Sequence, residues 1–279
     1  MPAARLALLL SLTAASACMP PSWGASALLH PTRHKAARQP TRPFEAFEWQ
    51  GDGVPLVGWW FHAAVNTRGT VVYLHGVTDN RASGIGIAEH FVPQGFDVVA
   101  FDSRAHGDSG GDACTYGFYE KRDLERIIDH LPRAPVVVMG TSLGAAVGLQ
   151  AAAEDRRIAA VVSIAAFADL RTAAYERAPF FASRSNLESA FRLAEAEGRF
   201  RVDDVSPVDA APRISAPVLL IHGDADKETS YAEALRILAA LNEPKRLITI
   251  PGGEHGGGLT TDVWRQVDAW LTTARAHPT

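Results

Sequence analysis

From about residue 70 onward, short runs rich in Val, Ile and Leu alternate with longer stretches of helical composition. Short continuous apolar runs suit strands that are buried on both faces of a sheet. Where such strands alternate with helices, the sheet is mostly parallel and carries helices on both faces. The sequence therefore predicts an α/β fold, and 279 residues are enough for one large domain of this kind.

The expected elements are given by residue range. Two strands, Phe44–Trp49 and Leu56–His62, should form an antiparallel pair around the turn Gly51-Asp52-Gly53. The later strands are predicted at Thr70–Leu74, Asp97–Phe101, Pro135–Met139, Ala159–Ile164, Val218–Ile221 and Arg246–Ile250. Helices are predicted at Ala82–Val92, Phe118–His130, Leu143–Glu154, Tyr231–Leu241 and Thr261–Ala274. The stretch 167–214 is too long for a simple crossover, so we predict a short helical cap over the carboxyl edge of the sheet.

The N-terminal region has a different character. Arg5 precedes a short apolar stretch, Leu6–Ala17, which ends in small residues, and this order is typical of a secretory signal. The residues Ala15-Ser16-Ala17 fit ordinary signal peptidase, cutting before Cys18. The same segment resembles a bacterial lipobox, in which Cys18 would carry lipid and anchor the protein to a membrane. We therefore expect residues 1–18 to be an export signal, with the protein either periplasmic or lipid-anchored.

Residues 19–43 are rich in proline and alanine and show no apolar periodicity. Prolines recur through this stretch and disfavour a helix across most of it, so a flexible tether is predicted. Residues 44–279 then form the folded domain, which contains the cap at about 167–214.

Charge and composition exclude several classes of protein. The formal net charge of −4 leaves no basic footprint, so a nucleic-acid partner is not expected. Past the extreme N-terminus no apolar run reaches the length of about 18 residues that a spanning helix needs. Cys18 and Cys114 are the only cysteines, which excludes a disulfide-stapled fold. The sequence has no cluster of metal ligands and no phosphate-binding glycine loop, so no cofactor is expected.

The string Gly140-Thr141-Ser142-Leu143-Gly144 stands between a predicted strand and a predicted helix. In that setting a G-x-S-x-G string is typical of a sharp turn that exposes the serine hydroxyl at the edge of the sheet. Glycines on both sides let the strand and the helix approach closely, and the helix N-terminus offers free N–H groups. We therefore predict that Ser142 is a nucleophile.

A serine hydroxyl is a weak nucleophile at neutral pH and needs a general base. His255 is the best candidate, because it lies in a glycine-rich segment after the last predicted strand. A protonated imidazole needs a carboxylate on its other nitrogen, and Asp224 and Asp226 both follow a strand end. We assign this role to Asp226, which lies further into the loop. Asp224 is expected to hold the turn through backbone N–H groups and is the alternative acid.

An oxyanion hole needs two backbone N–H groups aimed at one point. Leu143 directly follows the predicted nucleophile and supplies the first. Val77 ends the segment Leu74-His75-Gly76-Val77, which follows the first parallel strand, and supplies the second. The His75 side chain is expected to hold this loop rather than to act on substrate.

From about Leu56 to Trp270 the chain resembles the α/β-hydrolase superfamily. The segments that carry the resemblance stand in the family's order: the His75-Gly76 loop, the loop Asp102–Gly111, the elbow Gly140–Gly144 and the loops of Asp226 and His255. The short cap is similar to that of small bacterial esterases and prolyl-oligopeptidase-like hydrolases. One departure is the polar run Lys227-Glu228-Thr229-Ser230, where many relatives carry an apolar residue and a proline.

The aromatic residues of the cap are expected mainly in its core, with some roofing a pocket for an apolar acyl or aromatic group: Phe167, Tyr175, Phe180, Phe181, Phe191 and Phe200. The charged residues of the cap, Arg177 among them, are expected on solvated faces.

These features predict a serine hydrolase that cleaves small-molecule carboxylic esters through an acyl-enzyme. A peptidase or amidase acting on short peptides with the same residues is the alternative. A non-catalytic binding module on a hydrolase fold is a third, more remote hypothesis.

Overall fold

The computed structural model describes residues 20–275 apart from residues 65–66, 133 and 181. The predicted export signal, including Cys18, lies outside the described residues. Every helix in the described part of the chain is too short or too polar to span a membrane.

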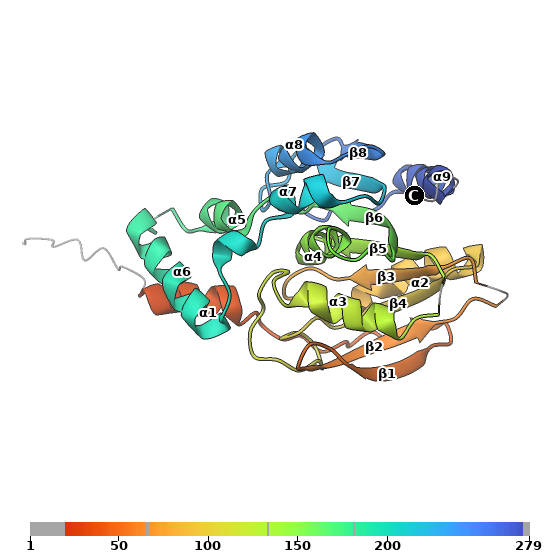
Figure 1. The fold of residues 1–279 in the computed structure, drawn as a ribbon, viewed down its shortest axis with the longest axis horizontal. Helices are drawn as coiled ribbons and strands as arrows, with labels where there is room; N and C mark the ends of the chain where they lie inside the picture. The colour runs from red at the N-terminus through yellow and green to blue at the C-terminus, as the bar shows by residue number, and fades with distance from the viewer. Residues whose placement is uncertain (1–19, 65–66, 133, 181, 276–279) are drawn as a thin grey trace, which may run out of the picture.

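An eight-stranded sheet forms the centre of the molecule (Figure 1). Its strands are β1 (Glu45–Gln50), β2 (Pro55–Phe61), β3 (Thr70–Leu74), β4 (Asp97–Phe101), β5 (Val136–Thr141), β6 (Ile158–Ile164), β7 (Val218–Gly223) and β8 (Lys245–Ile250). Their order in the sheet is β1-β2-β4-β3-β5-β6-β7-β8. β2 pairs antiparallel with both β1 and β4, and the remaining neighbours are parallel. The predicted α/β fold with a mostly parallel sheet is confirmed.

The helices are α1 (Pro21–Leu29), α2 (Ile85–Phe91), α3 (Glu120–Asp129), α4 (Leu143–Ala152), α5 (Leu170–Arg177), α6 (Arg184–Gly198), α7 (Pro207–Ala210), α8 (Tyr231–Ala240) and α9 (Thr261–Arg275). Successive side chains of a strand point to opposite faces. Val72 and Leu74 of β3 join a core with α3, α4 and α8, whereas Val71 and Tyr73 join a second core with α2 and α9. The continuous apolar runs therefore reflect helices on both faces.

The register of the parallel strands brings their carboxyl ends to one edge of the sheet. Leu74 of β3 lies beside Gly140 of β5, and Gly223 of β7 lies beside Ile250 of β8. The loops that follow these residues carry all the predicted site residues, so the topology gathers them at that edge.

The cap lies between β6 and β7 and consists mainly of α5, α6 and α7. Each of these helices begins at a residue whose side chain accepts a hydrogen bond from a backbone N–H of the first turn: Asp169, Ser183 and Ser206. Such N-caps satisfy amides that have no partner within the helix.

The segment before β1 differs from the predicted tether, because Pro21–Leu29 forms helix α1. Pro20 and Pro21 stand at the N-cap and the first turn, where proline is tolerated because its missing N–H would have no helical partner. Ala25 and Leu29, four residues apart, lie on one face and are buried. Figure 1 shows α1 beside α6, so the helix is held by packing against the cap.

Candidate active site

Ser142 lies on a sharp turn between β5 and α4. Its backbone has φ 52° and ψ −111°, a left-handed conformation that a residue other than glycine rarely adopts. The flanking glycines allow this turn. A Cβ at Gly144 would lie 2.2 Å from the Leu74 carbonyl oxygen, and one at Gly140 would lie 2.3 Å from the backbone of Gly144. The G-x-S-x-G spacing thus follows from close contact among strand, turn and helix.

His255 lies in the turn between β8 and α9 and approaches the serine. Its Nε2 is 3.0 Å from the Ser142 Oγ, which is a hydrogen-bond distance. Two glycines near His255 are required, one by its backbone conformation and one by a close contact. Gly256 has φ 61°, and a Cβ at Gly223 would lie 2.1 Å from the Gly253 carbonyl oxygen. The close contact between the two loops directs the imidazole toward the elbow.

Asp226 lies on the opposite side of the imidazole, with its side chain fully buried. Its Oδ2 is 2.8 Å from His255 Nδ1, while its Oδ1 accepts the backbone N–H groups of Glu228 and Thr229, both at 2.9 Å. A carboxylate accepts the Nδ1 proton and leaves Nε2 unprotonated, so Nε2 accepts the Ser142 hydroxyl. The three side chains form a continuous chain of hydrogen bonds.

Asp224, the alternative acid, lies elsewhere in the same loop. Its Oδ1 accepts the backbone N–H of Gly252 at 2.6 Å and so joins the loops after β7 and β8. This is the turn-holding contact expected from the sequence. The acid that contacts His255 in the structure is Asp226.

The Asp226 carboxylate has a second imidazole neighbour, His222 of β7. Its buried Nε2 donates to the Thr229 carbonyl oxygen at 2.9 Å and lies 3.3 Å from Asp226 Oδ2. The position of His222 at the end of β7, four residues before Asp226, is the signal that could have indicated this second neighbour of the carboxylate.

The loop after β3 lies directly against the nucleophile. A Cβ at Gly76 would be 3.7 Å from the Ser142 Cβ, and the His75 carbonyl oxygen accepts the N–H of Gly144 at 3.1 Å. Val77 is the next residue of this loop, and Leu143 is the first residue of α4. Both predicted oxyanion amides therefore belong to backbone that flanks Ser142, and their role stays a prediction.

The His75 side chain holds this loop through hydrogen bonds to backbone groups, as expected. Its Nε2 accepts the backbone N–H of Ser103 at 3.0 Å, so the proton is on Nδ1, which donates to the Gly76 carbonyl oxygen at 2.7 Å. Burial lowers the pKa of His75 and keeps the imidazole neutral. The ring therefore joins the loops after β3 and β4.

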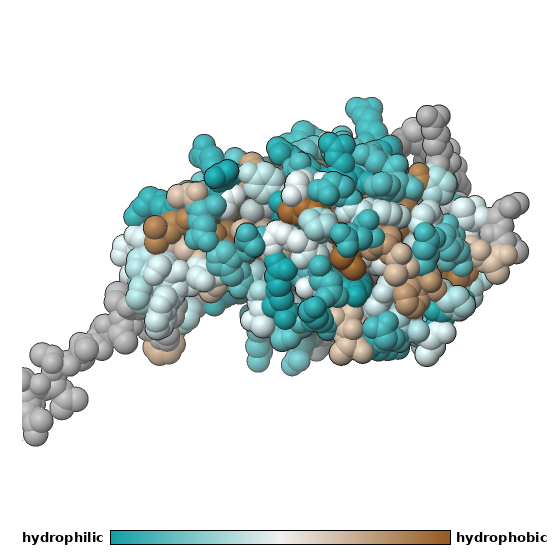
Figure 2. Space-filling model, turned by 90° about the horizontal axis from the view of Figure 1, so that it is seen from below, coloured by the Kyte–Doolittle hydropathy of each residue, from teal (hydrophilic) through white to brown (hydrophobic). Residues whose placement is uncertain are grey.

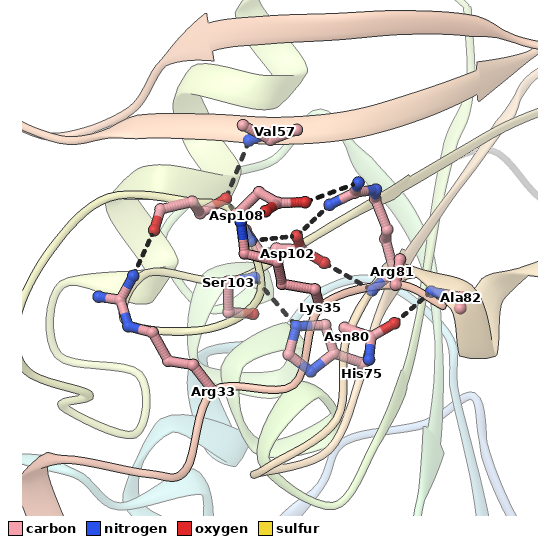
Figure 3. A network of polar contacts seen from close by, with 12 residues as sticks. Arg33, Lys35, Val57, His75, Asn80, Arg81, Ala82, Asp102, Ser103 and Asp108 are labelled. Atoms are coloured by element: carbon pink, nitrogen blue, oxygen red, sulfur yellow. Dashed lines mark hydrogen bonds and ion pairs between the residues drawn. The ribbon is translucent and has the colours of Figure 1, made fainter. Parts of the chain in front are cut away.

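Figure 3 shows how the loop after β4 is braced. Asp102 accepts the backbone N–H of Arg81 at 2.7 Å and that of Asp108 at 2.8 Å, and it also pairs with the Arg81 guanidinium. Lys35 and Arg33, from the segment before β1, extend the network. Lys35 pairs with Asp108 at 2.9 Å, and Arg33 donates to a loop carbonyl at 2.9 Å. The N-terminal segment is thus fastened to the loops of the sheet edge.

An apolar cavity of about 230 Å³ lies under the cap. Leu170 and two aromatic residues of the cap, Phe167 and Phe191, line it. We expected some cap aromatics to line a pocket. Phe180, by contrast, is fully exposed. Phe181 lies outside the described residues. On the face shown in Figure 2, hydrophobic residues form only small separate groups among hydrophilic ones.

Arg177, which the sequence placed on a solvated face, joins the cavity to the loop of Asp226. It lines the cavity. Its Nε donates to the Glu228 carbonyl oxygen at 2.9 Å, and its Nη2 donates to Thr229 Oγ1 at 2.8 Å. Arg177 therefore connects the apolar cavity to the loop that carries Asp226.

No group of three His, Cys, Asp or Glu side chains among the described residues is arranged to hold a metal ion. The chemistry available at the site is that of a hydroxyl, an imidazole and a buried carboxylate beside a helix N-terminus.

Comparison with known proteins identifies the family. Residues 69–200 match the family described as having the alpha/beta hydrolase fold. YqkD of Bacillus subtilis (strain 168), which is uncharacterized, is 31% identical over 211 residues, covering 72% of this chain and 69% of YqkD. The chain belongs to the α/β-hydrolase family.

Two other proteins that are similar to this α/β hydrolase are named for their activities. The mitochondrial palmitoyl-protein thioesterase ABHD10 of Mus musculus is 26% identical over 197 residues, covering 62% of this chain and 64% of that protein. The structure of the Pyrococcus furiosus esterase Pf2001 matches with a TM-score of 0.72 at 24% identity, covering 88% of this chain and 98% of the esterase. This structural likeness shows a shared fold, and the family supports a hydrolase activity.

Proposed function

We propose that this α/β hydrolase cleaves carboxylic esters through an acyl-enzyme intermediate. The observation that carries the proposal is the chain of hydrogen bonds from Ser142 Oγ through His255 to Asp226, with distances of 3.0 and 2.8 Å. These are the contacts that an activated serine nucleophile requires.

In the first half of the reaction, Ser142 Oγ attacks the ester carbonyl carbon while His255 Nε2 takes the hydroxyl proton. Asp226 stabilises the imidazolium through Nδ1. The N–H groups of Val77 and Leu143 stabilise the oxyanion of the tetrahedral intermediate. His255 then gives the proton to the leaving alcohol, and the acyl group remains on Ser142.

In the second half, water takes the place of the alcohol. His255 removes a proton from the water as it attacks the acyl carbon, and then returns a proton to Ser142 Oγ as the acid leaves. The buried carboxylate of Asp226 is held by two backbone N–H groups, which keep it oriented through both halves.

The apolar cavity supports an uncharged acyl group. Its lining is mostly aliphatic and aromatic and would bury apolar surface of the substrate.

Cleavage of amides is the second candidate, and Glu228 is the feature that favours it. Its Oε2 lies 3.9 Å from His255 Nε2, and its side chain is 65% exposed. A carboxylate at this place could bind the amino terminus of a short peptide. The comparison of aminoacyl p-nitroanilides with p-nitrophenyl esters, in the wild type and in Glu228→Gln, separates the two activities.

The decisive experiment is hydrolysis of p-nitrophenyl esters by the full chain, with Ser142→Ala as the control. We expect turnover that falls by several orders of magnitude in the variant, up to about 10⁶-fold. Labelling by a fluorophosphonate tests the non-catalytic alternative, since a binding module would leave Ser142 unlabelled.

We also propose that residues 1–18 direct export, with Cys18 either the first mature residue after ordinary cleavage or the site of lipid attachment. The support is the order of charged, apolar and small residues. Metabolic labelling with a fatty acid, compared between wild type and Cys18→Ser, distinguishes the two forms.

A further inference from the structure

Helix α1 contributes one wall of the apolar cavity. Gly24, Ala27 and Leu28 line it together with Ala174 of α5 and Leu187 of α6. This helix precedes β1 and lies outside residues 69–200, which match the family. The segment before the matched residues therefore forms part of the cavity lining.

The position of α1 is fixed by close packing. A Cβ at Gly24 would lie only 2.9 Å from the Ala190 Cβ, so the glycine lets α1 and α6 approach closely. Ala25 and Leu29 are almost fully buried. The Leu29 carbonyl oxygen accepts the N–H of Cys114 at 2.8 Å, which joins the end of α1 to the loop before α3.

Polar contacts secure the residues that follow α1. His30 Nδ1 lies 2.7 Å from the Asp112 carbonyl oxygen, and its Nε2 lies 2.7 Å from the Glu197 carboxylate of α6. Together with the contacts of Arg33 and Lys35 described above, these bonds hold the segment at several points. These contacts fix the position of α1, and with it the cavity wall.

Two of the residues that line the cavity connect it to the backbone around the proposed site. Arg177 on its edge bonds the loop of Asp226. Phe167 lines it and lies three residues after Ile164, whose carbonyl oxygen accepts the N–H of Ser142 at 2.8 Å. Arg177 is the one charged residue among the described residues that line the cavity, and its guanidinium is engaged by the loop.

We propose that α1 closes the acyl-binding site of this enzyme and sets the length of the acyl chain that it accepts. The inference rests on the proposed esterase function. A methylene is similar in size to a water molecule, which occupies about 30 Å³ in the liquid. The cavity of about 230 Å³ therefore suits an unbranched, uncharged chain of roughly six to eight carbons.

The test uses p-nitrophenyl esters from acetate to dodecanoate and the full chain. Each methylene that enters the cavity should raise kcat/KM by roughly three- to fourfold. We expect the wild type to prefer hexanoate or octanoate over acetate, and to lose activity with longer chains.

Ala27→Trp places an indole on the α1 wall. It should lower the ratio of octanoate to acetate turnover by about tenfold or more. Ser26→Trp is the matched control, because Ser26 is an exposed neighbour on α1 that does not line the cavity. It should leave the ratio unchanged.

Ala174→Phe fills the cavity from α5 and tests whether acyl chains bind in this cavity. An unchanged octanoate to acetate ratio in Ala27→Trp overturns the role of α1, even if Ala174→Phe lowers it. An unchanged ratio in both variants shows that acyl chains bind elsewhere, while the esterase function still stands.

A binding experiment separates this inference from the proposed function. Octanoate, the product acid, is titrated into the protein in a calorimeter, which needs no turnover. Binding by the wild type and Ser26→Trp that is lost in Ala27→Trp supports the α1 wall even if no ester is cleaved. Equal binding by all three proteins, or none by the wild type, overturns it.

Discussion

Arg177 Nη2 lies 2.8 Å from Thr229 Oγ1 and joins helix α5 of the cap to the loop that carries Asp226. The two residues are 52 positions apart in the chain. The N–H of Thr229 in turn bonds the Asp226 carboxylate at 2.9 Å. The cap therefore contacts Thr229, one of the two residues whose N–H groups bond the Asp226 carboxylate.

Arg177→Ala should lower kcat by about tenfold, because it removes two hydrogen bonds worth about 1 kcal/mol each from the acid loop. Arg177 acts here as a positioning residue. Arg177→Lys should recover part of the loss, since one amine can replace one of the two bonds. The measurement is kcat and KM for a short-chain ester. Arg192→Ala, an exposed arginine of α6, is the control and should match the wild type.

Asp226→Asn should lower kcat by about 10⁴-fold, because an amide in this position favours the wrong imidazole tautomer. Asp224→Asn makes the same chemical change two residues away. It removes only a charge from the turn bond to Gly252 and should cost less than about tenfold. Steady-state kinetics of the two variants decide between the two acids. A larger loss in Asp224→Asn would reverse the assignment.

The parts of the fold that sequence analysis predicted are those fixed by local pattern. The strand β3 was expected at Thr70–Leu74 and lies there, because a buried parallel strand needs a continuous apolar run. The turn at Ser142 could be predicted because its two glycines are required by close contacts. A Cβ at Gly140 would clash with Gly144, and a Cβ at Gly144 would clash with Leu74 of the neighbouring strand. Close packing at this point leaves few alternative sequences.

Helix α1 and the role of Arg177 were missed for a common reason. The buried face of α1, Ala25 and Leu29, is short, and its packing partner α6 lies more than 150 residues away in the chain. Arg177 similarly has no local partner, since its acceptors lie in the loop after β7. Contacts distant in sequence leave no periodic pattern, so composition suggested a tether and a solvated charge instead.

Backbone strain at Ser142 gives a prediction about stability. A left-handed conformation costs a residue with a Cβ about 1–3 kcal/mol and costs glycine little. Ser142→Gly should therefore unfold at higher urea concentration than Ser142→Ala, by about 1 kcal/mol, while both lack activity. At Ser163, a buried residue of β6, the same pair should have the opposite order, because glycine weakens an ordinary strand. Equal stability of the Ser142 pair would show that the turn carries no strain.

His106 makes the stability of the fold depend on pH. It is fully buried beside the His75 ring, with Nδ1 donating to the Arg104 carbonyl oxygen at 2.8 Å. Burial, followed by the nearby His75, lowers the pKa of His106 from 6.5 to about 4. Between pH 4 and pH 6.5 the His106 imidazole is mostly protonated in the unfolded chain and mostly neutral in the folded protein. The contribution is therefore fully present above pH 6.5 and is lost progressively as the pH falls toward 4.

For this one group, the expected loss of unfolding free energy between pH 7.5 and pH 5 is about 2 kcal/mol. His106→Asn keeps a donor near the Nδ1 position but cannot titrate, so its unfolding free energy should fall by about 2 kcal/mol less over the same interval. Urea unfolding of both proteins at the two pH values gives the difference directly. His90→Asn is the control, because His90 is partly exposed and bonded to Asp268. Its loss of unfolding free energy between the two pH values should be larger than that of His106→Asn. An identical loss in wild type and His106→Asn would mean that His106 is protonated in the folded protein as readily as in the unfolded chain.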